Sequence, residues 1–406
     1  MNILFLTMSS FRSVDQRGIY TDLMRKFRDE GHNVFVVAPT ERRFHQPTRL
    51  IHEHGVNLLQ VKTLNVQKTN VVEKGLGQLS LEVLFKRAIH KYMEDVTFDL
   101  ILYSTPPITF SGVISSLKKK NPHVVTYLLL KDIFPQNAVD LGMFSKSSFI
   151  YRYFRHQERK LYHLSDYIGC MSPANVDFIK KNNLDVNPAR VEVAPNSIEL
   201  VDDETSDAAK YQMHRDMKQK YGLPQNKIIF VYGGNLGKPQ GIDFLMRCLE
   251  KVDKYKDAFF LIVGGGTEYG KLATWYEQHK AGNIKLLNSL PKEEYDLLVS
   301  SCDVGLIFLD YRFTIPNYPS RLLSYLEYKM PIIAATDKNT DIGKIAEENG
   351  YGYWCESTDV ATFLMLIEKM LANTDEIKQM GDNGYQFLKN NYLVEHTYHA
   401  IMQHLS

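Results

Sequence analysis

The sequence of 406 residues has few cysteines, almost no net charge and no long apolar run. Its cysteines show neither a Cys-x-x-Cys pair nor the spacing of a zinc site; they are Cys170, Cys248, Cys302 and Cys355. We expect reduced thiols, mostly in the core of a cytoplasmic protein. No run approaches the roughly 18 apolar residues that a membrane-spanning helix needs, so any membrane contact must be peripheral. The apolar start, Met1 to Met8, has no basic region or cleavage pattern, so we expect a strand there and not a signal peptide.

The charges nearly cancel, because 48 Lys and Arg residues face 47 Asp and Glu residues, for a net charge of +1. This balance argues against nucleic acid as a partner of the chain as a whole. The composition, 44% hydrophobic and 23% charged, is typical of a globular protein. The length exceeds that of one ordinary core, so we expect two domains of roughly 200 residues each.

The first half alternates apolar strands with helical patterns. A strand at Ile3–Leu6, a polar loop, a helix from Gly18 to Glu30 and a strand at Val34–Ala38 open a doubly wound α/β domain. Gly18 stands where the loop turns into the helix, so the amides around it face a ligand or belong to a plain tight turn. Further strands are predicted at residues 56–61, 98–103, 124–130, 166–172 and 191–194.

Asp132 follows the continuous apolar run Val124–Leu130, which is typical of a central parallel strand. Polar groups at the carboxyl edge of such a sheet often meet a ligand. Asp132 is therefore a candidate to hold a hydroxyl group or its proton, and the alternative is a cap for the next helix.

Two predicted helices, residues 71–95 and 149–164, carry many basic and aromatic side chains. Lys86 and Phe85 in the first, and Tyr153 and Arg155 in the second, would suit contact with an anionic lipid surface. The alternative for both helices is a solvated face on a helix packed against the sheet.

The second half begins after a polar segment, residues 199–226, that includes the acidic run 202–204 and reads as a linker and one helix. A strand at residues 227–232 runs into a loop with four glycines and Lys238 before a helix from Ile242. Glycines allow close approach of a ligand to free amides, so this loop predicts an anion site. It lacks the closing Gly-Lys-Ser/Thr of a Walker motif. A second glycine run, Gly264 to Gly266, has Tyr269 where a dinucleotide fingerprint needs glycine, which disfavours NAD.

Another strand is predicted at residues 259–263, before the second glycine run. A Pro-rich loop follows a further strand, residues 303–309, and ends at Pro319-Ser320-Arg321. Proline and serine favour a helix start there, so the amides of residues 320–323 are expected to lack carbonyl partners. Arg321 in the first turn opposes the helix dipole unless an anion joins it, which favours a phosphate site. The alternative is an ordinary connection with a solvated arginine. Strands at residues 284–287 and 332–335 complete a second parallel sheet.

Two such domains, with phosphate loops in the second, resemble the GT-B fold of glycosyltransferases: α/β, with two doubly wound Rossmann-like domains that face each other across a cleft. The landmarks resemble glycosyltransferase family four, in the bacterial O-antigen and capsule branch similar to L-fucosamine transferases. They are Gly31–Val34, Ser104–Pro107, Asp132–Pro135, Ala194–Asn196, Tyr232–Gly237, Val263–Gly266 and Pro319–Arg321. The resemblance implies an acceptor-side domain at 1–198, a nucleotide-sugar domain at 199–384 and, at 385–406, a helix that crosses back to the first domain.

The resemblance also implies the chemistry: a hexosyltransferase-type enzyme that moves a sugar from a nucleotide diphosphate sugar, with UDP as the expected carrier, and retains the anomeric configuration. The expected acceptor is a lipid-linked glycan of capsule or O-antigen polysaccharide, which would bring the protein to the inner face of the plasma membrane. No metal or cofactor is expected. The implied catalytic residues are Asp132, Lys238 and Arg321. The implied donor-binding residues are Gly18, Asn196, Gly233, Gly234, Asn235, Lys238, Gly266, Leu290, Pro319, Ser320, Arg321, Leu322, Ser324 and Glu327.

The sequence departs from the family pattern at several of these positions. Asn235 and Gln240 stand where members usually carry an arginine and a lysine, and Ser324 stands where a ribose-binding glutamate is usual. Glu327, one helical turn further on, is the expected substitute for that glutamate. Lys131 stands where several members have a histidine. Two other functions therefore stay open: a GT-B epimerase or inverting transferase, and a non-catalytic subunit that binds a nucleotide sugar.

Overall fold

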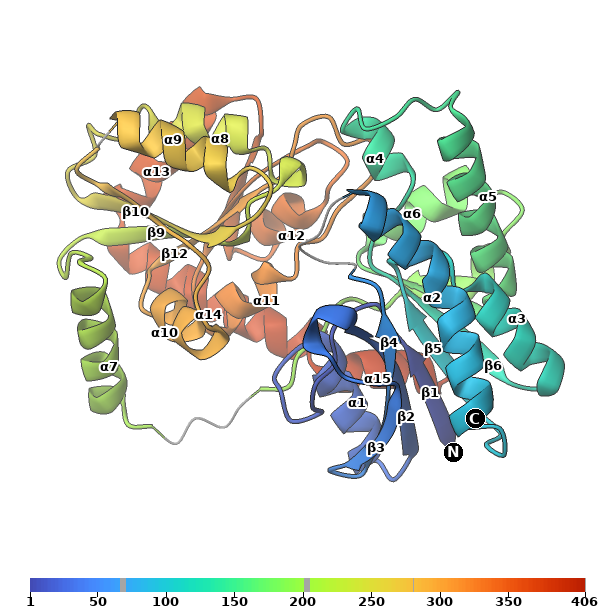
Figure 1. The fold of residues 1–406 in the computed structure, drawn as a ribbon. Coiled ribbons are helices and arrows are strands. Elements are labelled where there is room, and N and C mark those ends of the chain that lie inside the picture. The colour runs from blue at the N-terminus through green and yellow to red at the C-terminus, as the bar shows by residue number, and fades with distance from the viewer. Residues whose placement is uncertain (66–70, 201–204, 280, 406) are drawn as a thin grey trace. The chain divides into compact units, whose positions relative to one another are not determined.

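The computed structural model of the protein describes residues 1–65, 71–200, 205–279 and 281–405. The chain divides into two compact units, which Figure 1 draws with the colours of the sequence. The first unit comprises Met1–Glu199 and Tyr392–Ser406, and the second comprises Leu200–Asn391. The acidic run at 202–204 lies outside the described residues.

The first unit contains an eight-stranded sheet in the order β3-β4-β2-β1-β5-β6-β7-β8. All of its pairs are parallel except β3 with β4. The central strands are buried and apolar, as predicted for a doubly wound sheet. Strand β3 was not predicted, because it is a polar edge strand with Arg49 opposite Gln60. The strands are β1 (Asn2–Leu6), β2 (Asn33–Glu41), β3 (Arg49–Glu53), β4 (Val56–Thr63), β5 (Leu100–Ser104), β6 (Val125–Leu130), β7 (Tyr167–Cys170) and β8 (Val191–Val193).

Helices cover both faces of this sheet. The C-terminal helix α15 packs beside α1, where Tyr398 and Ile401 join the core of the first unit (Figure 1). Helix α2 packs on α3, and α3 packs on α5. The helices are α1 (Ile19–Asp29), η1 (Arg42–Phe44), α2 (Val71–Tyr92), α3 (Ser111–Lys120), α4 (Gln136–Asp140), α5 (Phe149–Leu164), α6 (Pro173–Asn182), η2 (Pro188–Arg190) and α15 (Val394–Met402).

The second unit contains a six-stranded parallel sheet in the order β11-β10-β9-β12-β13-β14. Figure 1 shows α8 and α9 over one face of it and α10 and α11 over the other. Strand β14 was not predicted. The strands are β9 (Ile228–Asn235), β10 (Ala258–Gly265), β11 (Ile284–Leu287), β12 (Val304–Phe308), β13 (Ile332–Thr336) and β14 (Gly352–Glu356). The helices are α7 (Asp207–Lys220), η3 (Lys238–Gln240), α8 (Ile242–Leu249), α9 (Tyr269–His279), α10 (Lys292–Ser300), α11 (Arg321–Glu327), α12 (Ile342–Glu348), α13 (Val360–Ala372) and α14 (Thr374–Asn391).

The strand order places a switch point in each sheet, which is where ligands bind in open α/β sheets. The order reverses beside β1 in the first unit and beside β9 in the second. The loops after β1 and β5 flank the first switch point, and the loops after β9 and β12 flank the second. All four cysteines are free and buried, as expected from the sequence.

Candidate functional site

The glycine loop after β9 packs so tightly that side chains are excluded at several of its positions. Gly234 has φ of +118°, a conformation that favours glycine, and it pairs with Gly264 of β10. A β-carbon at Gly264 would collide with the carbonyl of Gly234, and one at Gly266 would collide with the carbonyl of Leu236. Gly266 therefore has a packing role that is independent of any ligand.

Two polar side chains, Asn235 and Gln240, hold the shape of this loop. The Gln240 Oε1 atom accepts hydrogen bonds from Asn235 Nδ2 at 2.9 Å and from the Gly237 amide at 3.1 Å. Asn235 and Gln240 thus close the loop on itself. Lys238, which begins η3, is exposed and forms no ion pair within the described part of the chain.

Arg321 lies against the glycine loop inside a group of tyrosines. Its guanidinium carbon lies 4.3 Å from the centroid of the Tyr232 ring, and a β-carbon at Gly234 would lie 3.5 Å from its Nη2 atom. Tyr325, four residues along α11, accepts a hydrogen bond of 3.2 Å from the Gly233 amide. Burial raises the pKa of Tyr295 to about 12, and the positive charge of nearby Arg321 opposes this rise only in part. These tyrosines come from β9, α10 and α11, so three elements fix the position of the guanidinium.

The Nη1 atom of Arg321 is buried and has no hydrogen-bond partner among the described residues. No carboxylate forms an ion pair with this guanidinium in the described ranges. Buried charged donors normally have a partner, because an unpaired one costs free energy. The arrangement therefore has the capacity to accept an anion.

The start of α11 differs from the sequence expectation. The amide of Leu322 donates to the Pro319 carbonyl and that of Leu323 to the Ser320 carbonyl, so these two amides are not free. Hydrogen bonds between residues three apart, as here, are common in the first and last turns of helices. Ser320 occupies the N-cap position but its side chain makes no capping hydrogen bond. Ser324 is half-buried one turn after Arg321, and Glu327, the last residue of α11, is already engaged within the chain.

The loop between β12 and α11 is held by residues that the sequence did not single out. The Asp310 amide donates to the Pro239 carbonyl at 2.9 Å, which joins this loop to the glycine loop. The Asp310 carboxylate accepts from Arg312 Nε and Nη2, both at 2.8 Å. Further along, the Asn317 amide donates to Thr340 Oγ1 at 3.0 Å. These bonds fix the loop that leads into α11, and so fix the backbone position of Arg321.

Leu290 lies apart from this group, in the loop between β11 and α10, where it is half-buried. A β-carbon at Gly265, at the end of β10, would meet the Ser289 hydroxyl. The structure thus brings Gly233, Gly234 and Arg321 into one cluster, with Leu290 two strands away at the same edge of the sheet.

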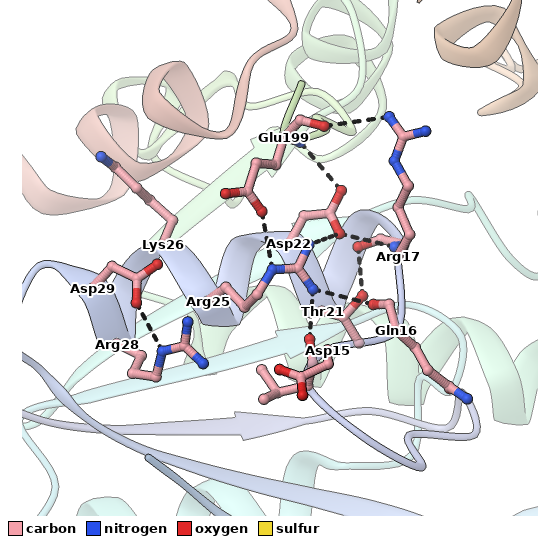
Figure 2. A network of polar contacts seen from close by, with 12 residues as sticks. Asp15, Gln16, Arg17, Thr21, Asp22, Arg25, Lys26, Arg28, Asp29 and Glu199 are labelled. Atoms are coloured by element: carbon pink, nitrogen blue, oxygen red, sulfur yellow. Dashed lines mark hydrogen bonds and ion pairs between the residues drawn. The ribbon is translucent and has the colours of Figure 1, made fainter. Parts of the chain in front are cut away.

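In the first unit, the Gly18 amide donates a hydrogen bond to a carboxylate of the protein itself. Figure 2 shows the buried Asp22 carboxylate, which accepts from the Gly18 amide at 2.9 Å and from Arg25 Nη2 at 2.6 Å. Its other oxygen accepts from the Glu199 amide at 3.2 Å. Arg17 Nη2 donates to the Glu199 carbonyl at 3.3 Å. Of the two readings of Gly18, this bond favours the plain tight turn, because the amide already has a partner inside the protein.

Asp132 lies at the other side of the same switch point, after β6. The Thr105 hydroxyl accepts from the amides of Lys131 and Asp132, at 3.0 and 3.2 Å, and fixes the backbone there. Loss of hydration beside the surrounding protein raises the pKa of the Asp132 carboxyl group from its ordinary value to about 6. Burial lowers the pKa of Lys131 to about 7, and its Nζ donates to the Ala194 carbonyl at 3.2 Å. Burial raises the pKa of Tyr20, near Ser104 and Asp132, to about 12.

Asn196 follows β8 and is buried, and its Oδ1 atom has no partner among the described residues. The neighbouring Pro195 carbonyl accepts from Thr397 Oγ1 of α15 at 3.2 Å. The backbone at Asn196 is thus tied to the C-terminal helix, and its side-chain oxygen is left to accept a donor.

Comparison with known proteins identifies the family. Residues 19–201 match the model described as Glycosyltransferase Family 4, and residues 213–387 match that described as Glycosyl transferases group 1. WbjE of Pseudomonas aeruginosa, a protein named as a glycosyltransferase, is 23% identical over 331 residues, 80% of this chain and 78% of WbjE. The chain belongs to glycosyltransferase family four. It is thus a glycosyltransferase, as the sequence motifs predicted.

Two further comparisons place this family-four glycosyltransferase. WcaI of Escherichia coli strain K12, named as a colanic acid biosynthesis glycosyl transferase, is 26% identical over 152 residues, 35% of this chain and 36% of WcaI. The solved structure of HepE from Anabaena with UDP and glucose has a TM-score of 0.72 at 15% identity and covers 100% of this chain and 99% of HepE. The predicted GT-B fold, with two Rossmann-like units, is confirmed.

Some features of this glycosyltransferase were not predicted from the sequence. Tyr232 and Tyr295 come from segments distant in sequence from Arg321, and only Tyr325, four residues after it on the same helix, could have been placed near it from spacing alone. In the described ranges, no helix has both the length and the apolar character that crossing a bilayer requires. The described residues also contain no group of three His, Cys, Asp or Glu side chains placed to hold a metal ion.

Proposed function

We propose that the protein transfers a sugar from a nucleotide diphosphate sugar, with UDP as carrier, to a lipid-linked glycan, with retention of configuration at the anomeric carbon. The setting is the assembly of a bacterial surface polysaccharide of capsule or O-antigen type. The unpartnered Nη1 atom of Arg321 beside Gly234 is the observation that carries the proposal. The name of WcaI and the UDP complex of HepE support the same substrate classes.

A diphosphate suits the cluster around Arg321. Its oxygens accept the paired N–H groups of a guanidinium, and such bonds are strong when both partners are charged. Gly234 has no side chain, so a ligand can approach the backbone beside Arg321. Lys238 at the start of η3 supplies a second cation. The tyrosines hold the guanidinium in place before any ligand arrives.

The proposed reaction needs charge stabilisation more than a strong protein base. The bond from the anomeric carbon to the diphosphate oxygen breaks, and a bond to the acceptor oxygen forms on the same face of the sugar. The acceptor proton passes to the leaving diphosphate oxygen. Arg321 and Lys238 stabilise the negative charge that grows on the diphosphate, and fixed cations do this most effectively. Asp132, ionised at neutral pH, orients the acceptor hydroxyl.

The exposed face of α5 supports a lipid-linked acceptor. We define this α5 surface by four apolar side chains, Met143, Phe149, Ile150 and Tyr153, and four basic ones, Lys146, Arg152, His156 and Lys160. Phe149 is 85% exposed, and the Arg152 guanidinium lies 5.7 Å from its ring centroid. The basic residues line part of a groove of about 710 Å³.

Two acidic residues on or near α5 already pair with arginines outside the α5 surface. Glu158 is buried and accepts from Arg155, and Asp185 pairs with Arg159. The four basic residues of the α5 surface form no ion pair in the described part of the chain. Apolar side chains beside the uncompensated Lys146, Arg152 and Lys160 fit the interface of an anionic bilayer. Helix α2 is the weaker candidate, because its Phe85 is buried and stacked on Phe110.

A thermal-shift screen with UDP-, GDP-, ADP- and dTDP-sugars tests the donor, because a ligand that binds the native state raises the melting temperature. We expect stabilisation by one nucleotide and transfer or slow hydrolysis of its sugar. Arg321→Ala and Lys238→Ala should abolish both effects, whereas Arg247→Ala, an exposed arginine on α8, should not. Full activity in the first two variants would show that the donor site is misplaced. Stabilisation without turnover would favour a binding subunit, and a changed donor sugar would favour an epimerase.

Flotation with vesicles tests the lipid contact. The protein should float with phosphatidylglycerol vesicles and stay behind with phosphatidylcholine vesicles. Phe149→Ser with Ile150→Ser should abolish flotation, and Lys86→Gln with Lys91→Gln on α2 should leave it unchanged. Absence of the unsubstituted protein from both vesicle fractions would rule the α5 surface out as a membrane site.

A further inference from the structure

A groove of about 740 Å³ opens at the carboxyl edge of the first sheet, and none of its lining residues belongs to the candidate site described above. It is lined by the loop after β1, the end of β2, the short helix η1, Arg49 of β3 and Gln60 of β4. We call it the arginine groove, after Arg12, Arg43 and Arg49. Because parallel strands β1, β2, β5 and β6 end at the same edge, the groove and Asp132 share that edge.

The arginine groove has more positive than negative charge. Glu41 is the one carboxylate among the described residues that line it, and this buried group already pairs with Arg43 Nη2 at 2.5 Å. Arg49 Nε donates to the Gln60 side-chain oxygen at 3.1 Å, which leaves its other N–H groups without a carboxylate. Arg12 forms no ion pair within the described ranges. The lining therefore has two cations in excess of its acid.

An aromatic ring lies close to two of these arginines. Phe44 is 42% exposed, and the guanidinium carbons of Arg12 and Arg43 each lie 5.2 Å from its ring centroid. Contact with the ring face holds a guanidinium in place without using its N–H groups. The groove thus combines an apolar face with charged donors beside it. This combination matches a sugar ring, whose C–H face packs on an aromatic ring, joined to an anionic group.

We propose that the arginine groove binds an anionic group of the acceptor, with Phe44 packed against the adjoining sugar ring. The anionic group is the carboxylate of a uronic acid or the diphosphate that joins a glycan to its lipid. Arg12 and Arg49 bind its oxygens, since a guanidinium pairs well with both groups. The inference rests on the proposed function, because it assigns a chemical class to the acceptor of that reaction.

Binding of matched probes tests this inference. Methyl β-glucuronide and methyl β-glucoside differ in the carboxylate, and saturation-transfer NMR compares their affinities. Geranyl diphosphate, titrated by calorimetry with excess UDP present to occupy the donor site, represents the lipid source. We expect the glucuronide or the geranyl diphosphate to bind, and the glucoside to bind at least about tenfold more weakly than the glucuronide if the carboxylate is the recognised group. Which of the two anionic probes binds identifies the source.

Substitutions separate the groove from the donor site. Arg12→Gln with Arg49→Gln should weaken the bound anionic probe about tenfold or more. Arg42→Gln, the neighbouring arginine that does not line the groove, should leave binding unchanged. Arg43 is kept, because its loss would leave buried Glu41 without its partner. All variants should keep the thermal stabilisation by the nucleotide sugar.

Two results would overturn the inference. One is equal binding of an anionic probe to the unsubstituted protein and the double variant. The other is binding of neither anionic probe. If either occurs while the nucleotide sugar still stabilises the protein, the groove inference fails and the proposed function stands. If no nucleotide sugar raises the melting temperature of the unsubstituted protein, the proposed function is refuted instead.

Discussion

Replacement of Arg321 by Met should remove donor binding at little or no cost in stability. The unpartnered Nη1 atom lowers the stability of the free protein by about 1–3 kcal/mol, the usual penalty for a buried unsatisfied donor. The contact with Tyr232 opposes this and contributes about 0.5–2 kcal/mol. Because the two effects nearly cancel, Arg321→Met should change the free energy of unfolding by less than about 2 kcal/mol.

Arg312→Met is the matched control, because it removes an arginine that has a partner, in the loop that precedes α11. Arg312 holds the buried Asp310 carboxylate with two hydrogen bonds of 2.8 Å, so its loss leaves a buried acid poorly compensated. We expect a cost of about 1–3 kcal/mol, together with normal donor binding if the loop keeps its position.

Urea unfolding followed by tryptophan fluorescence measures both variants. The two tryptophans of the chain, Trp275 and Trp354, lie in the second unit, as do both arginines. Fluorescence therefore reports the unit that carries the substitutions. If Arg321→Met lowers stability more than Arg312→Met does, or leaves nucleotide-sugar binding intact, Arg321 is a structural residue and the donor assignment is wrong.

Three further predictions concern other residues. Gly234→Ala should cost about 1 kcal/mol or more in urea unfolding because φ is +118°, and should weaken donor binding; unchanged binding would place the diphosphate elsewhere. Burial lowers the pKa of Lys131 to about 7, so between pH 7 and 9 the unfolded chain binds more protons than the folded one. Over this pH range the free energy of unfolding should then rise by on the order of 2 kcal/mol more in the unsubstituted protein than in Lys131→Met. Unfolding followed by circular dichroism measures both proteins, and an equal change with pH in the two would contradict this. Asp22→Ala should cost about 1–3 kcal/mol, since it leaves partly buried Arg25 without its closest carboxylate and the Gly18 amide without its acceptor, and unchanged stability by the same method would refute that account.

The strands were predictable where burial on both faces makes a continuous apolar run. This holds for β6 and β12, whose residues are buried throughout or nearly so. It fails for β3, whose exposed Arg49 and Leu50 give no alternation that marks a strand. The edge strand β14 has a glycine and a glutamate at its ends and a half-buried centre, so its sequence gives an equally weak signal.

The sequence indicates the glycines and the two cations of the candidate site, but not the residues that surround them. Lys238 and Arg321 follow from local chemistry, because each stands at a loop-to-helix junction. The position of Tyr295 beside Arg321 depends on how α10 packs, which no local pattern encodes. At Gly18 the local pattern was misleading, because a carboxylate four residues later fills the position that an outside anion would take.

The return of the chain at Tyr392 has a consequence for the order of folding. The amide of Ile198 donates to the Tyr392 carbonyl and that of Val394 to the Ile198 carbonyl, so the chain leaves and re-enters the first unit side by side. The second unit is in effect a domain inserted into the first. During synthesis, residues 200–391 are all available to fold before α15 emerges, whereas the core of the first unit waits for Tyr398 and Ile401. The unit that begins first along the chain is therefore the one completed last.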